Sequence, residues 1–314
     1  MRTLGRLVLL TLLAIPAARA GDAEAKALRD KASKAWSDGK DQAEVLKLFD
    51  EALAAKPTDR AILYSTLLMK GQYLQAIVSD LPAAEVVYTK IITELAGLEE
   101  SETVLRMLKS EAMAAKAVLV YAAREDAEQA VSLFKGALMN WTKSSICDRG
   151  SQFLFRLGRD ATKRDAGKRK ELMDISLKSA QEAVQFIAKE QPQADKAAPA
   201  LARYQLQLAV VQLALGQEEE ARKTRAAIDQ AQLGAQPGTL YQQALWHVLS
   251  GDADAATAAL KEFMVKTRPS GPAGVKSRNQ LRKFIRGEPD FKPLFAREDW
   301  KELTVDEPEE KPGK

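Results

Sequence analysis

The sequence predicts an all-α fold in which helical hairpins stack one after another and a C-terminal helix closes the row. Three observations predict it. Strong helix formers dominate the 314 residues, and Gly and Pro number only 17 and 12. Runs of alternating Val, Ile and Thr, which are typical of strands, are hard to find. Small and aromatic residues recur together at a period of about 34 residues.

The first 20 residues have the pattern of an export signal rather than of a folded segment. A basic start precedes an apolar run from Leu7 to Ile15, which is too short to anchor the chain in a bilayer. We expect Pro16 to break the helix, and Ala18-Arg19-Ala20 has the small residues that signal peptidase recognises. The sequence therefore predicts a signal peptide over residues 1–20, cleaved after Ala20, and an exported chain. A retained N-terminal anchor is the alternative.

Charge and cysteine content limit what the sequence supports. Removal of Arg2, Arg6 and Arg19 with the signal leaves 44 basic against 43 acidic residues. A nearly neutral chain gives no support to a role on nucleic acid or on a membrane surface. Cys147 is the only cysteine, so no internal disulfide can form and helix packing alone must hold the fold.

The repeat pattern is clearest in four segments, each with a first helix, a short turn and a second helix. The first unit, Arg29–Pro57, contains Ser33, Trp36, the turn Ser37-Asp38-Gly39-Lys40, Val45, Phe49, Ala52 and Pro57. The second unit, in residues 111–142, contains Tyr121, Ala130, Phe134 and Ala137. The third unit contains Ala202, Ala209, Leu215-Gly216, Ala221 and Ile228. The fourth unit contains Pro237, Ala244, His247, Ser250-Gly251, Ala256, Leu260 and Phe263.

Two weaker units lie between these. In residues 64–98 the positions at second-helix spacing are Ala84, Tyr88 and Ile91. Residues 147–191 exceed one repeat, and we expect an extended connection around Ala166-Gly167. Small residues let helix axes approach and aromatic residues fill the gaps between neighbouring pairs, so each pair must stack on the next. An ordinary helical bundle with chance spacing is the alternative.

This pattern resembles the tetratricopeptide repeat family, with Val45 as the main departure from its template. The resemblance covers most of the mature chain and implies a right-handed solenoid of helical hairpins over residues 21–304. It specifies a fold and no activity. In that family the first helices line a concave surface that holds a peptide or a helix of a partner.

The C-terminal region contains an acid-Pro-Asp-Phe-x-Pro-Leu segment before a short aromatic helix, within residues 280–304. It looks like the closing element of many tetratricopeptide chains. The side chains expected to form the cap are Phe291, Leu294, Phe295 and Trp300. Residues 305–314 are charged, rich in Pro and poor in apolar side chains, so we expect a disordered tail. Ser270-Gly271-Pro272-Ala273-Gly274 is the expected internal loop.

No catalytic constellation, metal-ligand cluster or cofactor motif stands out. His247 is the only histidine, which excludes multi-histidine metal sites, and it occupies a packing position in its repeat. We expect Cys147 to be a buried thiol rather than a nucleophile. Gly271–Ser277 fails the spacing of a phosphate-binding loop. Asn140-Trp141-Thr142 is a glycosylation sequon that matters only in a eukaryotic host.

One basic segment, Arg149–Lys170, exceeds the background. On a helix, four of its residues fall within about 80° of arc, on a different side from Leu154 and Leu157. These four are Arg149, Arg156, Arg159 and Lys163. Such a face suits an acidic protein segment, a phospholipid headgroup or a cell-wall polymer. The alternative is a solvated face whose charge is balanced by Asp148, Asp160, Asp165 and Glu171.

These observations favour a non-enzymatic scaffold that binds a protein or peptide in the periplasm or outside the cell. By resemblance, first-helix positions that face a partner include Lys34, Ser37, Asp38, Arg203, Leu206, Val210, Tyr241 and Leu245. We expect Arg203 and Tyr241 to make contacts, because arginine and aromatic side chains often dominate interface energy. The alternative is a cell-envelope accessory protein that binds an anionic polymer or lipid headgroups through residues 149–170. We expect no cofactor, no nucleic acid and no transmembrane segment after signal cleavage, and leave a homo-oligomer open.

Overall fold

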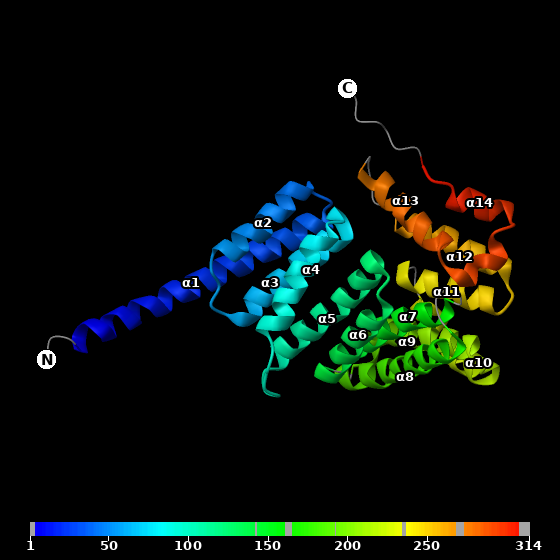
Figure 1. Cartoon of the computed structure of the whole chain (residues 1–314), viewed down its shortest axis with the longest axis horizontal. Helices are drawn as coiled ribbons and strands as arrows, with labels where there is room; N and C mark the ends of the chain where they lie inside the picture. The colour runs from blue at the N-terminus through cyan, green and yellow to red at the C-terminus, as the bar shows by residue number, and fades with distance from the viewer. Residues whose placement is uncertain are drawn as a thin grey trace, which may run out of the picture. The chain divides into compact units, whose positions relative to one another are not determined.

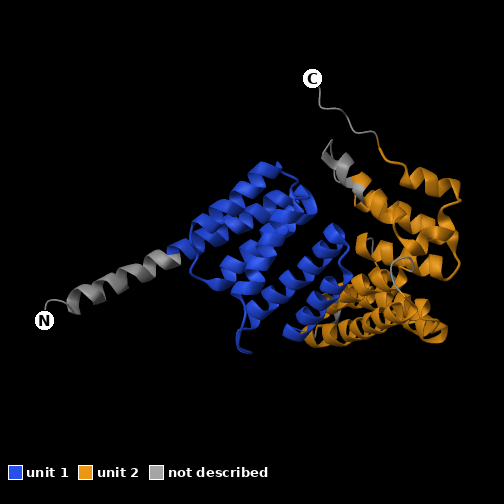
Figure 2. Ribbon diagram, viewed as in Figure 1, with its two compact units in different colours: residues 1–141 blue, residues 142–314 orange. Residues whose placement is uncertain are grey.

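The structure is a computed structural model. It describes residues 4–141, 143–160, 165–191, 193–233, 237–267 and 273–307, without the side chains of residues 4–19, 194–196, 230, 273–277 and 280. Every regular element in these ranges is a helix (Figure 1), which confirms the all-α prediction. The chain divides into two compact units, Met1–Trp141 and Thr142–Lys314 (Figure 2).

Unit 1 contains three consecutive helix pairs. The first is α1 (Leu4–Ser37) with α2 (Gln42–Ala54). The second is α3 (Arg60–Tyr73), extended by the π-helical turn η1 (Leu74–Val78), with α4 (Leu81–Glu94). The third is α5 (Thr103–Arg124) with α6 (Ala127–Asn140). Each helix packs against its partner, and α3 also packs against α1 and α5, so the first helices of successive pairs are neighbours.

Unit 2 contains helix pairs of less regular length and a closing segment. Its helices are α7 (Ser144–Arg159), α8 (Ala166–Glu190), α9 (Ala194–Ala214), α10 (Glu218–Ala226), the short η2 (Gln230–Leu233), α11 (Pro237–Leu249) and α12 (Ala253–Lys266). The closing segment comprises α13 (Ala273–Arg286), η3 (Pro289–Leu294) and α14 (Glu298–Thr304). Here α9 packs against both α7 and α11, so the first helices are again neighbours.

Aspartate side chains mark the starts of many helices. Each accepts a hydrogen bond from a backbone N–H of the first turn, a group that has no partner inside its own helix. The capping residues are Asp41, Asp59, Asp80, Asp126, Asp165 and Asp252. The turn between α11 and α12 also needs Gly251, whose φ of +84° is favourable only for glycine. Asp41 and Asp252 follow the turns predicted at Ser37-Asp38-Gly39-Lys40 and Ser250-Gly251, and both turns join the helices expected there.

The core of unit 1 lies between neighbouring pairs. The predicted second-helix positions are all fully buried, namely Val45, Phe49, Ala52, Ala84, Tyr88, Ile91, Ala130, Phe134 and Ala137. Small residues also bring helices together, as Gly71 on α3 shows. A Cβ atom at this position would lie 2.7 Å from Cε1 of Tyr88 on α4, so only glycine permits this approach.

The apolar end of unit 2 is closed by η3 and α14. Phe291, Leu294 and Trp300 are buried in one cluster with residues of α11 and α12, which confirms the predicted cap for these three. The prediction is wrong for Phe295, which is 40% exposed. Its ring stacks on Trp300 with centroids 5.2 Å apart, so it covers the cap from outside.

Four local predictions differ from the structure. Helix α1 continues through Pro16, because an internal proline removes one backbone hydrogen bond while the flanking turns can still form. Ala166-Gly167 begins α8 instead of an extended connection, because Asp165 accepts a hydrogen bond from the Lys168 backbone and caps the helix. Residues 305–307 are held by α13 rather than free, as shown below. Residues 161–164, 268–272 and 308–314 lie outside the described residues, and Ala273 and Gly274 of the predicted loop begin α13.

Candidate functional site

The basic face of α7 meets the acidic residues of η3 inside unit 2. Arg159 Nε donates to Asp290 Oδ1 at 2.8 Å, and Arg156 Nε lies 3.5 Å from Glu288 Oε2. The guanidinium of Arg156 also lies over the Phe284 ring, 4.2 Å from its centroid. Both carboxylates are almost fully buried, whereas each arginine remains about one third exposed. Two residues of the predicted anion-binding face therefore bind anions of their own chain.

Tyr241 on α11 completes this cluster. Its hydroxyl donates to Glu288 Oε2 at 2.6 Å. Its ring centroid lies 5.4 to 5.8 Å from those of Phe263, Phe284 and Phe291. Tyr241 was expected to face a partner, but its ring packs among these side chains because the cap supplies both aromatic neighbours and a hydrogen-bond acceptor.

Burial changes the pKa values of two acidic groups in this cluster, the Glu288 carboxyl and the Tyr241 hydroxyl. Burial raises the pKa of the Glu288 carboxyl, an effect that Arg156 opposes. Burial also raises the pKa of Tyr241, and the nearby Glu288 adds to the shift. Glu288 Oε1 and Asp290 Oδ2 have no hydrogen-bond partner among the described residues. A buried ion pair of this kind adds little net stability, but removal of one partner leaves a buried charge without a counter-ion and is strongly destabilising. We interpret the contacts of Arg156 with Glu288 and of Arg159 with Asp290 as a tie that positions η3 against α7.

A line of buried amide and hydroxyl groups links α7, α8, α9 and α11. Gln242 Nε2 donates to Gln207 Oε1 at 3.2 Å, and Gln207 Nε2 donates to Ser151 Oγ at 3.1 Å. The Ser176 hydroxyl donates to the Ser151 carbonyl at 2.8 Å. Because buried polar groups need partners, these hydrogen bonds fix how the four helices pack against one another.

Arg203, the other residue expected to contact a partner, is also engaged internally. Its Nη2 lies 3.1 Å from Asp148 Oδ2, and its guanidinium lies over the Tyr204 ring, 4.9 Å from the centroid. The Asp148 side chain is only 5% exposed. Burial raises its pKa to about 6, against the attraction of Arg203. The Arg203 side chain is 33% exposed, so only part of its surface is available for contact with a partner.

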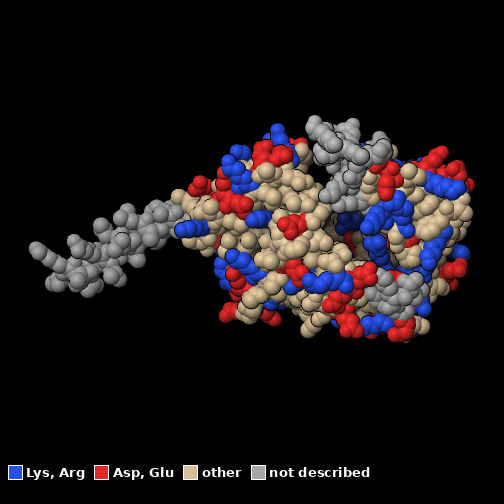
Figure 3. Space-filling model, turned by 45° about the horizontal axis from the view of Figure 1, so that its top comes forward, with Lys and Arg blue, Asp and Glu red and all other residues tan. Residues whose placement is uncertain are grey.

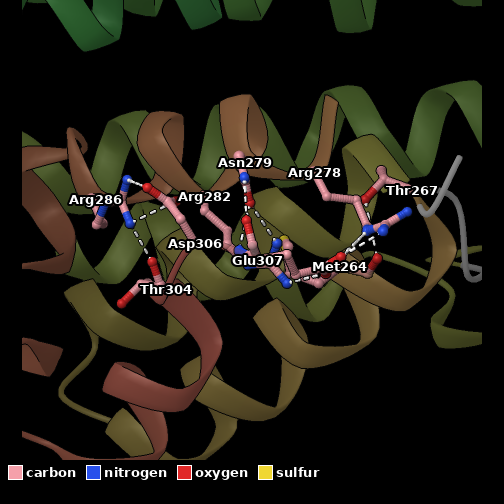
Figure 4. Close-up of polar contacts among 9 residues, drawn as sticks. All are labelled: Met264, Thr267, Arg278, Asn279, Arg282, Arg286, Thr304, Asp306 and Glu307. Atoms are coloured by element: carbon pink, nitrogen blue, oxygen red, sulfur yellow. Dashed lines mark hydrogen bonds and ion pairs between the residues drawn. The ribbon is translucent and has the colours of Figure 1, made fainter. Parts of the chain in front are cut away.

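The segment that follows α14 lies against a row of arginines on α13 (Figure 4). Arg278 Nε lies 3.0 and 2.9 Å from the two carboxylate oxygens of Glu307, and Arg282 Nη2 donates to Glu307 Oε1 at 2.6 Å. Asn279 contacts the backbone of the same residue. Its Nδ2 donates to the Glu307 carbonyl at 2.9 Å, and its Oδ1 accepts from the Glu307 N–H at 2.8 Å.

Arg286 extends this row by one further helical turn. It pairs with Asp306 at 3.0 Å and donates to the carbonyl oxygen of Thr304. Hydrogen bonds from Arg278 and Arg282 lower the pKa of Glu307 to about 2. Hydrogen bonding from Arg286 likewise lowers the pKa of Asp306. Residues 305–307 are therefore ordered, which corrects the predicted start of the tail.

A shallow pocket lies beside these arginines. It has a volume of about 220 Å³ and is bounded by α12, α13 and α14. Met264, Val265 and Leu303 supply its apolar wall, and Arg278 and Arg282 supply part of its polar wall. The pocket has the size and lining to take one apolar side chain next to a carboxylate.

The two residues considered for nucleophilic or acid–base chemistry lie in structural positions. Cys147 is fully buried, as predicted, and burial raises its pKa to about 12. His247 Nδ1 lies 3.8 Å from Asp252 Oδ2, and burial lowers its pKa. Among the described residues, no three His, Cys, Asp or Glu side chains are grouped to hold a metal ion. Within the same residues, no helix combines the length and apolar character needed to cross a membrane.

Of the remaining predicted contact residues, Leu206, Val210 and Leu245 are buried in the core instead of facing a partner. Lys34 is exposed in the last turn of α1, in unit 1, and Lys163 lies outside the described residues. The α13 row was not predicted, although Arg278, Arg282 and Arg286 stand four residues apart and residues 306–310 contain four acidic side chains. Basic and acidic side chains are interspersed over the face drawn in Figure 3, in agreement with the mixed charge of the sequence.

No protein-family model matches the chain, and no curated protein matches it either. The resemblance to tetratricopeptide repeats therefore stays a prediction.

Proposed function

We propose that this protein is a non-enzymatic scaffold of tetratricopeptide type that binds a protein or peptide outside the cytoplasm. The observation that carries the proposal is the contact between first helices. In unit 1, α3 packs against α1 and α5, and in unit 2, α9 packs against α7 and α11. Hairpins that stack through their neighbours present a continuous surface along their first helices, and this surface suits an extended partner.

One further observation supports a binding role over catalysis. The buried charged groups of unit 2 are joined in internal ion pairs, as Arg159 with Asp290 and Arg203 with Asp148 illustrate. The alternative, an envelope protein that binds anionic polymers through α7, has less support because Arg156 and Arg159 are already paired with carboxylates. Export rests on the pattern of residues 1–20, from which we propose a mature chain that begins at Gly21.

Site-specific photo-crosslinking tests the scaffold function. A crosslinking residue at Lys34 of α1 or at Val104 of α5 probes exposed first-helix positions. The matched controls are Val86 of α4 and Met139 of α6, which are exposed on second helices. We expect the first-helix probes to capture one and the same protein from the cell envelope, and the purified pair to form a complex of defined stoichiometry. Capture from the second-helix positions alone would contradict the proposal.

Sequencing of the N-terminus tests export. Protein recovered from outside the cytoplasm should begin at Gly21, and a chain retained in the cytoplasm with residues 1–20 intact would rule out the predicted localisation.

A further inference from the structure

We propose that the arginine face of α13 is a binding site for an extended acidic peptide, and that residues 304–307 of the same chain occupy it until such a peptide displaces them. The inference rests on the scaffold function proposed above and specifies the chemistry of a partner. The site is defined as the α13 face, formed by Arg278, Asn279, Arg282 and Arg286.

The contacts to the backbone indicate a peptide as the ligand. Asn279 donates to the Glu307 carbonyl and accepts from the Glu307 N–H, so one side-chain amide satisfies both backbone groups of one residue. Arg286 donates to the carbonyl oxygen of Thr304, the residue that ends α14, and the extended stretch begins at Val305. Backbone contacts of the Asn279 kind do not depend on the bound side chains, and they need a stretch of polypeptide whose N–H and carbonyl groups are not used within a helix. Inorganic phosphate offers oxygen acceptors for Asn279 Nδ2 but no N–H group for Asn279 Oδ1.

The side-chain contacts select for acids. Residues 273–286 carry five basic residues and no acidic one. The side chains of Arg278 and Arg282 are only 13% and 11% exposed beneath Glu307. Guanidinium groups that are shielded from water require a counter-charge, and a carboxylate fits their planar donor geometry. If residues 306 and 307 lost their charge, the α13 face would therefore attract another carboxylate.

The pocket beside the row adds a second element of recognition. Met264, Val265 and Leu303 form an apolar wall next to the groups that hold Glu307. An extended ligand could place an apolar side chain there while an adjacent acid contacts Arg278 and Arg282. The favoured ligand is thus a segment with two acids and a neighbouring apolar residue.

Residues 304–307 of the same chain control access to the α13 face because they cover it. Trp300 is 4% exposed and anchors α14 in the core, so residues 304–307 are held at a high effective concentration over α13. A free peptide must compete with this tethered segment. The Asp306 side chain is 52% exposed and that of Glu307 is 27% exposed, so salt weakens the pair of Asp306 with Arg286 more than the pairs of Glu307 with Arg278 and Arg282. Release of the segment therefore begins most easily at Asp306.

Peptide binding to an unmasked chain tests the inference. In the chain of residues 21–314, Asp306→Asn with Glu307→Gln removes both charges of the masking segment and leaves α13 intact. The probe is a fluorescein-labelled, amidated peptide, Leu-Thr-Val-Asp-Glu-Pro-Glu-Glu, and the matched control peptide is Leu-Thr-Val-Asn-Gln-Pro-Gln-Gln. We expect fluorescence anisotropy to show at least about tenfold tighter binding of the acidic peptide to the double variant than to the unmodified chain.

Asn279→Ala in the double-variant background keeps every positive charge and removes the backbone contact. We expect it to weaken acidic-peptide binding about fivefold or more, with helix content by circular dichroism unchanged. Equal binding of the acidic peptide to the masked and unmasked chains would overturn the inference. So would binding of inorganic polyphosphate as tight as that of the peptide with no effect of Asn279→Ala, because the face would then be a general anion site. If first-helix crosslinking succeeds while peptide binding fails, only this inference falls and the scaffold function stands.

Discussion

Arg159 of α7 and Asp290 of η3 are 131 residues apart in the chain and form an ion pair inside unit 2. The pair joins the first helix of the unit to its closing segment. In an open array of hairpins each repeat contacts only its neighbours, so a bond over this distance is unexpected. It makes the stability of the cap depend on a helix at the other end of the unit's sequence.

Loss of this ion pair should destabilise unit 2. Arg159→Ala leaves the buried Asp290 without its cation, and we expect the free energy of unfolding to fall by about 3 kcal/mol. Urea denaturation followed by circular dichroism measures the change. The control is Lys170→Ala, which breaks an exposed pair with Asp174 and should cost less than about 0.5 kcal/mol. An equal loss of unfolding free energy in the two variants would show that the pair of Arg159 with Asp290 stabilises the protein no more than an exposed pair does.

Asp148 should make stability depend on pH. Its pKa rises from 3.8 to about 6 on folding, so between these values the folded carboxyl keeps a proton that the unfolded one has lost. The contribution is therefore fully present below pH 3.8 and is lost as the pH rises through about 6. Asp148→Asn removes this titration. The free energy of unfolding of the variant, relative to that of the unmodified chain, should rise by up to about 3 kcal/mol from about pH 4 to about pH 7. Urea denaturation at a series of pH values measures this difference. A constant difference between the two chains over this range would contradict the assignment.

Gly71→Ala should strain the contact between α3 and α4. The added methyl group would lie 2.7 Å from Cε1 of Tyr88, a fully buried ring whose hydroxyl donates to Gln75 Oε1 at 2.9 Å. We expect a loss of about 2 kcal/mol in the free energy of unfolding. Gly238→Ala is the matched control, because open space surrounds that position in α11, and it should be neutral or stabilising by up to about 1 kcal/mol. Thermal denaturation of both variants distinguishes strain from a general effect of the substitution.

Cys147 should resist thiol reagents in the folded chain. With its pKa raised to about 12, only about one thiol in ten thousand is ionised at about pH 8, and the side chain is fully buried. A colorimetric disulfide reagent should therefore detect no thiol in the native protein and one thiol per chain in concentrated urea. Rapid reaction of the native protein would mean that α7 opens frequently.

The sequence was most informative where packing repeats locally. Phe134 and Ala137 were predicted to be buried because their spacing matches one face of a helix, and both are fully buried. The hairpin turn at Ser250-Gly251 was predicted from its register in the fourth unit, and Gly251 takes the left-handed conformation there.

Contacts between distant residues were not predictable in this way. Arg156 and Arg159 were predicted to form an anion-binding face, with a solvated face balanced by nearby acids as the alternative, and both interpretations depend only on neighbouring positions of the sequence. Their partners, Glu288 and Asp290, come from the far end of unit 2. Tyr241 was misplaced for the same reason, since the acceptor for its hydroxyl is Glu288. A row of basic residues in the sequence does not reveal whether its counter-charges come from solvent ions, a partner or the same chain.

The tie between α7 and η3 also limits how this protein can change length during evolution. Repeat arrays commonly grow by duplication of whole hairpins. A hairpin duplicated between α7 and η3 would carry Glu288 and Asp290 away from Arg156 and Arg159, and it would leave two buried charges without counter-ions. Homologues of different length should therefore gain or lose hairpins in unit 1 while keeping the hairpin number of unit 2 constant.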